Sequence, residues 1–110
     1  MWQRYLDLIR MMRAAGIRIM AGTDLPVSTD MVPLHEELAL LVEAGLTPME
    51  ALQTATRNPA EYLGIQRTEG TVEVGKVADL VVLDANPLND IRNIERIHAV
   101  IVRGRLLELP

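Results

Sequence analysis

The sequence contains no cysteine and no phenylalanine, and its aromatic residues are limited to one tryptophan and two tyrosines. Without cysteine, a disulfide scaffold, a thiolate metal site and a cysteine nucleophile are all excluded. The core must therefore consist of leucine, isoleucine, valine, alanine and methionine. Long apolar runs are missing too, because no stretch reaches the roughly 18 residues needed to span a bilayer. We therefore expect a soluble, cytoplasmic protein that does not bind a membrane.

Basic charge is also in short supply. The chain has 15 acidic and 11 basic residues, which gives a formal net charge of −4 at pH 7. A nucleic-acid surface requires a surplus of lysine and arginine to displace phosphate counterions, so no nucleic-acid partner is expected. The 110 residues, of which 49% are hydrophobic, are enough for one small globular domain.

Apolar periodicity predicts two helices and one strand within the first 44 residues. Residues 2–15 have the pattern of an amphipathic helix that ends at Gly16. The run at 17–21 predicts a strand, and the polar, proline-containing stretch 22–33 predicts a loop. A second helix is expected from about 34 to 44. The apolar stripe of the first helix consists of Trp2, Tyr5, Leu6, Ile9 and Met12.

Two further helices are predicted from their cap sequences. Thr-Pro-Met-Glu at 47–50 has the spacing of a capping box with proline at the first helical position. Asn-Pro-Ala-Glu at 58–61 repeats that pattern, and Gly64 is expected to end the last helix.

The second half of the chain predicts a small, mainly antiparallel sheet. Its strands are expected at 71–74, 78–83, 97–102 and 105–107, with turns at 75–76 and 103–104. Residues 88–96 are polar and irregular, with room for one helical turn. The overall class is therefore α/β.

The strand at 17–21 has no partner of its own type. It lies between helices, as in a parallel sheet, and a parallel strand needs neighbours on both edges. Unpaired backbone groups cost about 1–3 kcal/mol each when they are buried. The chain is therefore expected to be the end of a larger structure.

Asp24 follows the carboxyl end of this strand, where α/β barrels and open sheets place their active-site groups. A carboxylate there can bind a divalent metal, orient a metal-bound water or act as general base. The alternative is that Asp24 accepts backbone N–H groups in a turn ahead of Pro26.

Three segments in this order resemble the C-terminal part of a metal-dependent amidohydrolase, in the imidazolonepropionase and Xaa-Pro dipeptidase-like branch. They are AGTD at 21–24, AGLTPMEALQTATRNPA at 44–60 and GKVADLVVLDANP at 75–87. The resemblance covers nearly all of the chain.

The resemblance implies a C-terminal fragment of a (β/α)8 barrel followed by part of a β-sandwich. Residues 1–64 would supply the last barrel strand and its helices, and residues 65–110 the sandwich portion. Asp24 would be both a ligand of a divalent metal, often zinc, and the catalytic proton carrier. The substrate class would be a small-molecule amide or dipeptide, whose amide or cyclic amide C–N bond is attacked by metal-activated water.

The remaining metal ligands of that family have no match here. The family uses a His-x-His motif, a bridging Lys or Glu and two later histidines, whereas this chain has only His35 and His98. The missing ligands would come from an N-terminal barrel segment, so we expect the isolated chain to be inactive.

Several other polar residues have both a functional and a structural interpretation. His35 opens the helix after the loop and could face a substrate, or it could simply pack near the helix start. Ser28 and Asp30 share the loop with Asp24, and loop polarity explains them equally well. His98 alternates with apolar residues on a strand, which favours a surface position. Three acids are most simply a solvated helix face: Glu36, Glu37 and Glu43.

Residues 70–77 fit the phosphate-loop spacing GxxxxGK, but Val77 replaces the required serine or threonine. An apolar strand is expected to follow instead of a helix, so we reject nucleotide binding and expect Lys76 to lie in a turn.

Two hypotheses follow. The chain is either the C-terminal portion of an amidohydrolase or a non-catalytic α/β module that binds a partner. Aggregation of the purified chain through exposed strand edges would favour the first, and a monomer that unfolds cooperatively would favour the second.

Overall fold

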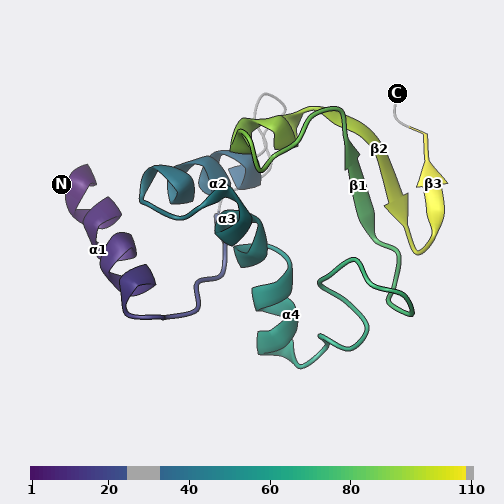
Figure 1. Ribbon diagram of the computed structural model, residues 1–110, viewed down its shortest axis with the longest axis horizontal. Helices are drawn as coiled ribbons and strands as arrows, with labels where there is room; N and C mark the ends of the chain where they lie inside the picture. Colours follow the sequence, from purple (N-terminus) through teal and green to yellow (C-terminus); the bar gives the residue numbers. More distant parts are fainter. Residues whose placement is uncertain (25–32, 109–110) are drawn as a thin grey trace.

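The computed structural model describes residues 1–24 and 33–108, with helices in the first half and a sheet in the second (Figure 1). It measures 43 × 33 × 28 Å along its principal axes. This is an α/β piece, as expected at the level of class. In chain order the elements are α1 (Trp2–Ala14), α2 (Pro33–Glu43), α3 (Pro48–Thr54), α4 (Arg57–Leu63), β1 (Leu80–Leu83), the 3₁₀ helix η1 (Ile91–Glu95), β2 (Ile97–Val102) and β3 (Arg105–Leu107).

The helix ends confirm most of the predicted caps. Gly16, which follows α1, has φ 76°, the left-handed conformation that ends a helix at low cost when the residue is glycine. At the start of α3, the Glu50 amide donates to Thr47 Oγ1 and the Thr47 amide donates to Glu50 Oε1, each at 3.1 Å. This is the capping box expected from the sequence. Gly64 ends α4 in the left-handed conformation.

The predicted cap of α4 is wrong. The helix begins one residue earlier than Asn58, at Arg57, and Thr56 precedes it without a side-chain cap bond. Asn58 lies inside the first turn, and its side-chain amide donates to a residue far away in the sequence. The side chain of Asn58, which the local spacing predicts as a helix cap, makes a tertiary contact instead.

The sheet has the strand order β1-β2-β3, and both pairs are antiparallel. Leu80 pairs with Ile101, and an irregularity follows Val82. Arg103 and Gly104 join β2 to β3 with φ 49° and 77°. Two consecutive positive φ values are those of a type I′ hairpin turn, whose twist suits adjacent strands. The predicted turn and its two flanking strands are therefore confirmed.

The strand expected at 71–74 is wrong, because these residues form a loop. Val72 is 82% exposed and Val74 is fully exposed. The turn at 75–76 does form, with the Lys76 amide donating to the Glu73 carbonyl at 3.2 Å. Alternating polarity needs a neighbouring strand to become a ladder, and among the described residues this segment has none.

The strand expected at 17–21 is likewise absent from the described sheet. The hydrogen-bond partners of this segment lie in helices, so no strand among the described residues offers the ladder of backbone bonds that would define one. Ile19 and Ala21 are partly buried and pack against the core.

The core joins the two halves through η1. Two isoleucines of η1, Ile91 and Ile94, pack against α2 and α3 residues. Outside the core, Arg92 of η1 pairs with Glu36 of α2 at 2.7 Å. The other buried members of this cluster are Leu38, Leu41, Leu46 and Ala51.

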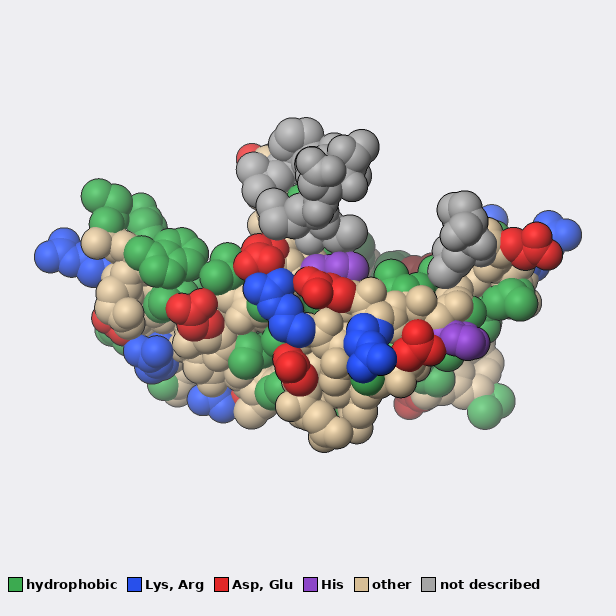
Figure 2. Space-filling model, turned by 90° about the horizontal axis from the view of Figure 1, so that it is seen from above, with side chains coloured by type: hydrophobic (Ala, Val, Ile, Leu, Met, Phe, Trp, Pro, Cys, Tyr) green, Lys and Arg blue, Asp and Glu red, His purple; other side chains and the backbone are tan. Residues whose placement is uncertain are grey.

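Helix α1 buries only part of its predicted apolar stripe. Leu6 is buried, whereas Trp2 and Tyr5 are 54% and 55% exposed. Figure 2 shows hydrophobic side chains gathered at the end of the molecule that α1 forms. Leu8 and Met11 extend this exposed surface. The helix prediction is confirmed, but its buried face is narrower than the sequence pattern indicated.

Candidate functional site

Asp24 is exposed at the end of the segment that connects α1 to the loop before α2. Its φ is 51°, in the left-handed region that aspartate and asparagine enter more readily than most residues. The rest of the loop, including Ser28 and Asp30, lies outside the described residues.

The segment that leads to Asp24 is held by one hydrogen bond from each of three helices. The side-chain amide of Asn58 in α4 donates to the Ile19 carbonyl at 2.9 Å. The Ala21 amide donates to the carbonyl of Thr54, the last residue of α3, at 2.9 Å. The Gly22 amide donates to Glu37 Oε1 of α2 at 2.8 Å. Backbone groups that a sheet would have paired are therefore satisfied by helices.

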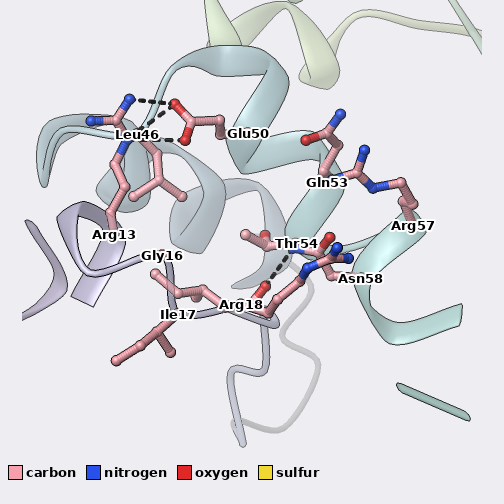
Figure 3. A pocket seen from close by; sticks show the side chains of 11 residues that line it. Arg13, Gly16, Ile17, Arg18, Leu46, Glu50, Gln53, Thr54, Arg57 and Asn58 are labelled. Carbon is pink, nitrogen blue, oxygen red and sulfur yellow. Dashed lines mark hydrogen bonds and ion pairs between the residues drawn. The ribbon is translucent and has the colours of Figure 1, made fainter. Parts of the chain in front are cut away.

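A cavity of about 190 Å³ lies at the start of this segment, away from Asp24 (Figure 3). In Figure 3, Thr54 and Asn58 face the turn that contains Gly16 and Arg18. Because Asp24 does not line it, the cavity is a feature distinct from the predicted site.

The arginines that line this cavity already have carboxylate partners. Arg13 contacts Glu50 at 2.8 Å, Arg18 pairs with Glu61, and Arg57 lies 3.6 Å from Glu61. Arg18 and Arg57 share the single carboxylate of Glu61, so these three arginines carry one positive charge more than their two acidic partners balance.

Glu50 has the most strongly shifted carboxyl group among the described residues. The hydrogen bond from Arg13, with that from the Thr47 amide, lowers the pKa of Glu50 from its ordinary 4.5 to about 2. Arg13 donates to both carboxylate oxygens, at 2.8–3.1 Å. This contact joins the end of α1 to the cap of α3, so it orients the helices around the segment that leads to Asp24.

His35 lies in the first turn of α2 and is half-buried. Among residues 1–24 and 33–108, no three His, Asp or Glu side chains are grouped so that they could hold a metal ion. The structure therefore does not bring His35 and Asp24 into a metal cluster, and both assignments stay predictions. His98 is an exposed residue of β2 whose Nδ1 lies 3.0 Å from Asp84 Oδ1, as expected of a surface position.

Two of the three acids expected on a solvated face of α2 have structural partners. Glu43 is exposed as predicted. Glu36 accepts from Arg92, and this hydrogen bond lowers the pKa of its carboxyl. Glu37 accepts from Gly22, and its Oε2 is buried without a hydrogen-bond partner among the described residues. No local pattern marks these partners, because they are 15 and 56 residues away in the chain.

The GxxxxGK segment has the structure expected of a turn. Lys76 Nζ lies 2.6 Å from Thr71 Oγ1 and 2.7 Å from Glu73 Oε2. The Lys76 ammonium group therefore already has two partners within this turn. The segment is followed by strand β1, whereas a phosphate loop would continue into a helix.

Within the part of the chain that is described, no helix is long and apolar enough to cross a membrane.

The amidohydrolase family model matches residues 4–107. An imidazolonepropionase of Maricaulis maris is 40% identical over 84 residues, which cover 69% of this chain and 19% of that protein. A 5-methylthioadenosine/S-adenosylhomocysteine deaminase of Moorella thermoacetica is 35% identical, with 90% of this chain and 28% of that protein covered. The chain thus spans less than a third of the length of these relatives.

Solved structures of related enzymes also superpose on nearly all of this chain. A Xaa-Pro dipeptidase with bound methionine superposes with a TM-score of 0.84 at 36% identity, over 94% of this chain and 25% of that one. A putative prolidase from Bifidobacterium longum has a TM-score of 0.80 at 41% identity, over 96% of this chain and 26% of that one.

Proposed function

The chain belongs to the amidohydrolase family, in the branch of the imidazolonepropionases and Xaa-Pro dipeptidases, and on that premise we propose that it is the C-terminal portion of a metal-dependent hydrolase of amide or cyclic amide C–N bonds. The observation that carries the proposal is the match over residues 4–107, with Asp24 exposed at the end of a segment held by three helices. A dipeptidase and a deaminase both break a C–N bond, and this shared chemistry supports the reaction class.

In this proposal, residues 1–64 contribute the last strand of a (β/α)8 barrel with its helices. The segment at 17–21 becomes that strand when a preceding part of the polypeptide supplies its neighbours. Residues 65–110 contribute part of a β-sandwich. Exposed apolar residues on both portions support this, because a monomer seldom leaves large apolar patches open. Examples are Trp2, Met11, Val81 and Leu106, which are between 54% and 68% exposed.

Asp24 would supply one metal ligand through its carboxylate. The described residues offer no three-ligand cluster, and a catalytic zinc takes about three protein ligands, so the others would come from the preceding polypeptide. A divalent metal such as zinc supplies Lewis-acid chemistry that makes water nucleophilic at neutral pH. The carboxylate of Asp24 would accept the proton of the attacking water and pass it to the leaving nitrogen. His35 would face the small-molecule amide or dipeptide substrate.

A chimera tests this function. The part of the Bifidobacterium longum prolidase that matches this chain is replaced by the 110 residues, and metal content and Xaa-Pro dipeptide hydrolysis are measured. We expect a metal-loaded, active chimera, a loss of about 10²- to 10⁴-fold in kcat for Asp24→Asn, and unchanged activity for Glu43→Gln, an exposed acid of α2.

The isolated chain is expected to show no turnover. Metal-dependent amide hydrolysis by the purified 110 residues would contradict the proposal that they are one portion of a barrel. A folded, metal-loaded chimera whose activity is unaffected by Asp24→Asn would remove the proposed role of that residue.

A further inference from the structure

We propose that Glu37 is a positioning residue that holds the Gly22–Asp24 backbone from α2 and so directs the Asp24 carboxylate. This inference rests on the proposed function of Asp24. The contact that carries it is the hydrogen bond from the Gly22 amide to Glu37 Oε1, at 2.8 Å, two residues before Asp24.

Glu37 is used differently from the acid beside it. Glu36 points to Arg92 of η1 and makes two hydrogen bonds of 2.7 and 2.9 Å with its guanidinium. Glu37 instead accepts from the Gly22 backbone, and its Oε2 is shielded from solvent without a hydrogen-bond partner in the described part of the chain. Shielding a carboxylate oxygen in this way is unfavourable, so a solvated helix face does not explain the arrangement. Its specific structural contribution is the acceptor that it offers to Gly22.

The hydrogen bond between Gly22 and Glu37 lies close enough to Asp24 to affect its backbone conformation. Gly22 has no Cβ, and outside its two chain neighbours no atom lies within 4 Å of where a Cβ would be, so no side chain of its own holds this residue in place. The preceding amide, that of Ala21, is held by α3. The consecutive amides of Ala21 and Gly22 are thus bonded to two different helices, three and two residues before Asp24. The left-handed φ of 51° at Asp24 needs surrounding structure to maintain it.

The first experiment measures hydrogen exchange of the Gly22 amide by NMR in the full 110-residue chain. Glu37→Leu should accelerate that exchange about ten- to hundredfold, the effect of removing a bond to a charged acceptor. Glu37→Gln, which keeps a carbonyl oxygen for the same amide, should restore most of the protection. Glu43→Leu, on the exposed face of the same helix, should leave it unchanged. An unprotected Gly22 amide in the wild-type chain, or equal protection in the leucine and glutamine variants, would overturn the proposal.

The second experiment measures zinc affinity, by competition with a chromophoric chelator, in the prolidase chimera described above. Glu37→Leu should weaken zinc binding about tenfold, in the range found when a supporting contact behind a metal ligand is lost, and Glu37→Gln should bind as the parent does. If Asp24→Asn weakens zinc binding and Glu37→Leu does not, the positioning role fails while the proposed function stands. If neither variant changes zinc affinity although Glu37→Leu exposes the Gly22 amide, the backbone contact is real and the proposed metal-ligand role of Asp24 fails.

Discussion

Gly70 is the position where one added methyl group should disturb this fold most directly. Its φ is 99°, and a Cβ built on it would lie 2.5 Å from the Ala60 Cβ of α4 and 3.2 Å from the Thr56 carbonyl oxygen. The Ala60 Cβ has no rotamer that could move it away, so the backbone of the loop or of α4 must shift. Gly70 is the first glycine of the GxxxxGK pattern, and the structure uses it for close packing against a helix.

The loss of unfolding free energy in Gly70→Ala has two parts, backbone strain and steric overlap, and a matched control separates them. Gly75→Ala introduces the same residue at φ 92° with no atom within 4 Å, so it contains only the backbone strain of about 1 kcal/mol. Gly70→Ala adds the overlap with Ala60, which costs about 1–3 kcal/mol in a packed site. We expect Gly70→Ala to lower the free energy of unfolding by about 2–4 kcal/mol in total.

Urea unfolding followed by circular dichroism at 222 nm measures both variants, and a double-mutant cycle with Ala60→Gly isolates the clash. On its own, Ala60→Gly destabilises α4 by about 1 kcal/mol, and in the Gly70→Ala background it also removes the clash, so the coupling free energy of the cycle should be about 1–3 kcal/mol. Equal unfolding free energies for the two alanine variants, or strictly additive effects in the cycle, would refute the steric argument.

Two further predictions concern the core and the acid stability. Leu41→Ala, at a side chain 6% exposed in the core, should cost about 2–5 kcal/mol of unfolding free energy, whereas Leu34→Ala, 40% exposed in the same helix, should cost about 1 kcal/mol or less by the same urea titration. Glu50 has its pKa lowered from 4.5 to about 2 in the folded chain, so its contribution to stability is complete above pH 4.5 and is lost as the pH falls toward 2. Glu50→Gln should therefore reduce the pH dependence of the urea unfolding midpoint between pH 5 and pH 2. A variant whose midpoint falls as steeply with pH as that of the wild type would contradict this account.

The strand predictions succeeded where the chain contains both partners. The runs at 97–102 and 105–107 pair with each other, and 80–83 pairs with the first of them. The equally plausible runs at 17–21 and 71–74 form no ladder among the described residues. The difference lies outside each run, because a strand is defined by the hydrogen bonds of its neighbour.

The same distinction applies to polar residues. Thr47 and Glu50 are three residues apart and cap α3 as predicted, because both partners of that motif are local. Asn58 and Glu37 were assigned to local structure, as a cap and as a solvated acid. Both instead bind the backbone of the 17–24 segment, 39 and 15 residues away. Sequence spacing contains no information about contacts of that range.

The sequence by itself determined the α/β class, most of the helix boundaries, the hairpin and the family resemblance, because each depends on short-range periodicity, turn chemistry or the order of motifs. Tertiary structure alone decided that three helices hold the segment leading to Asp24, that Glu37 supports Gly22, and that Gly70 packs against Ala60. These features depend on which distant residues meet once the core of α2, α3 and η1 has formed, and such encounters are a property of the folded chain.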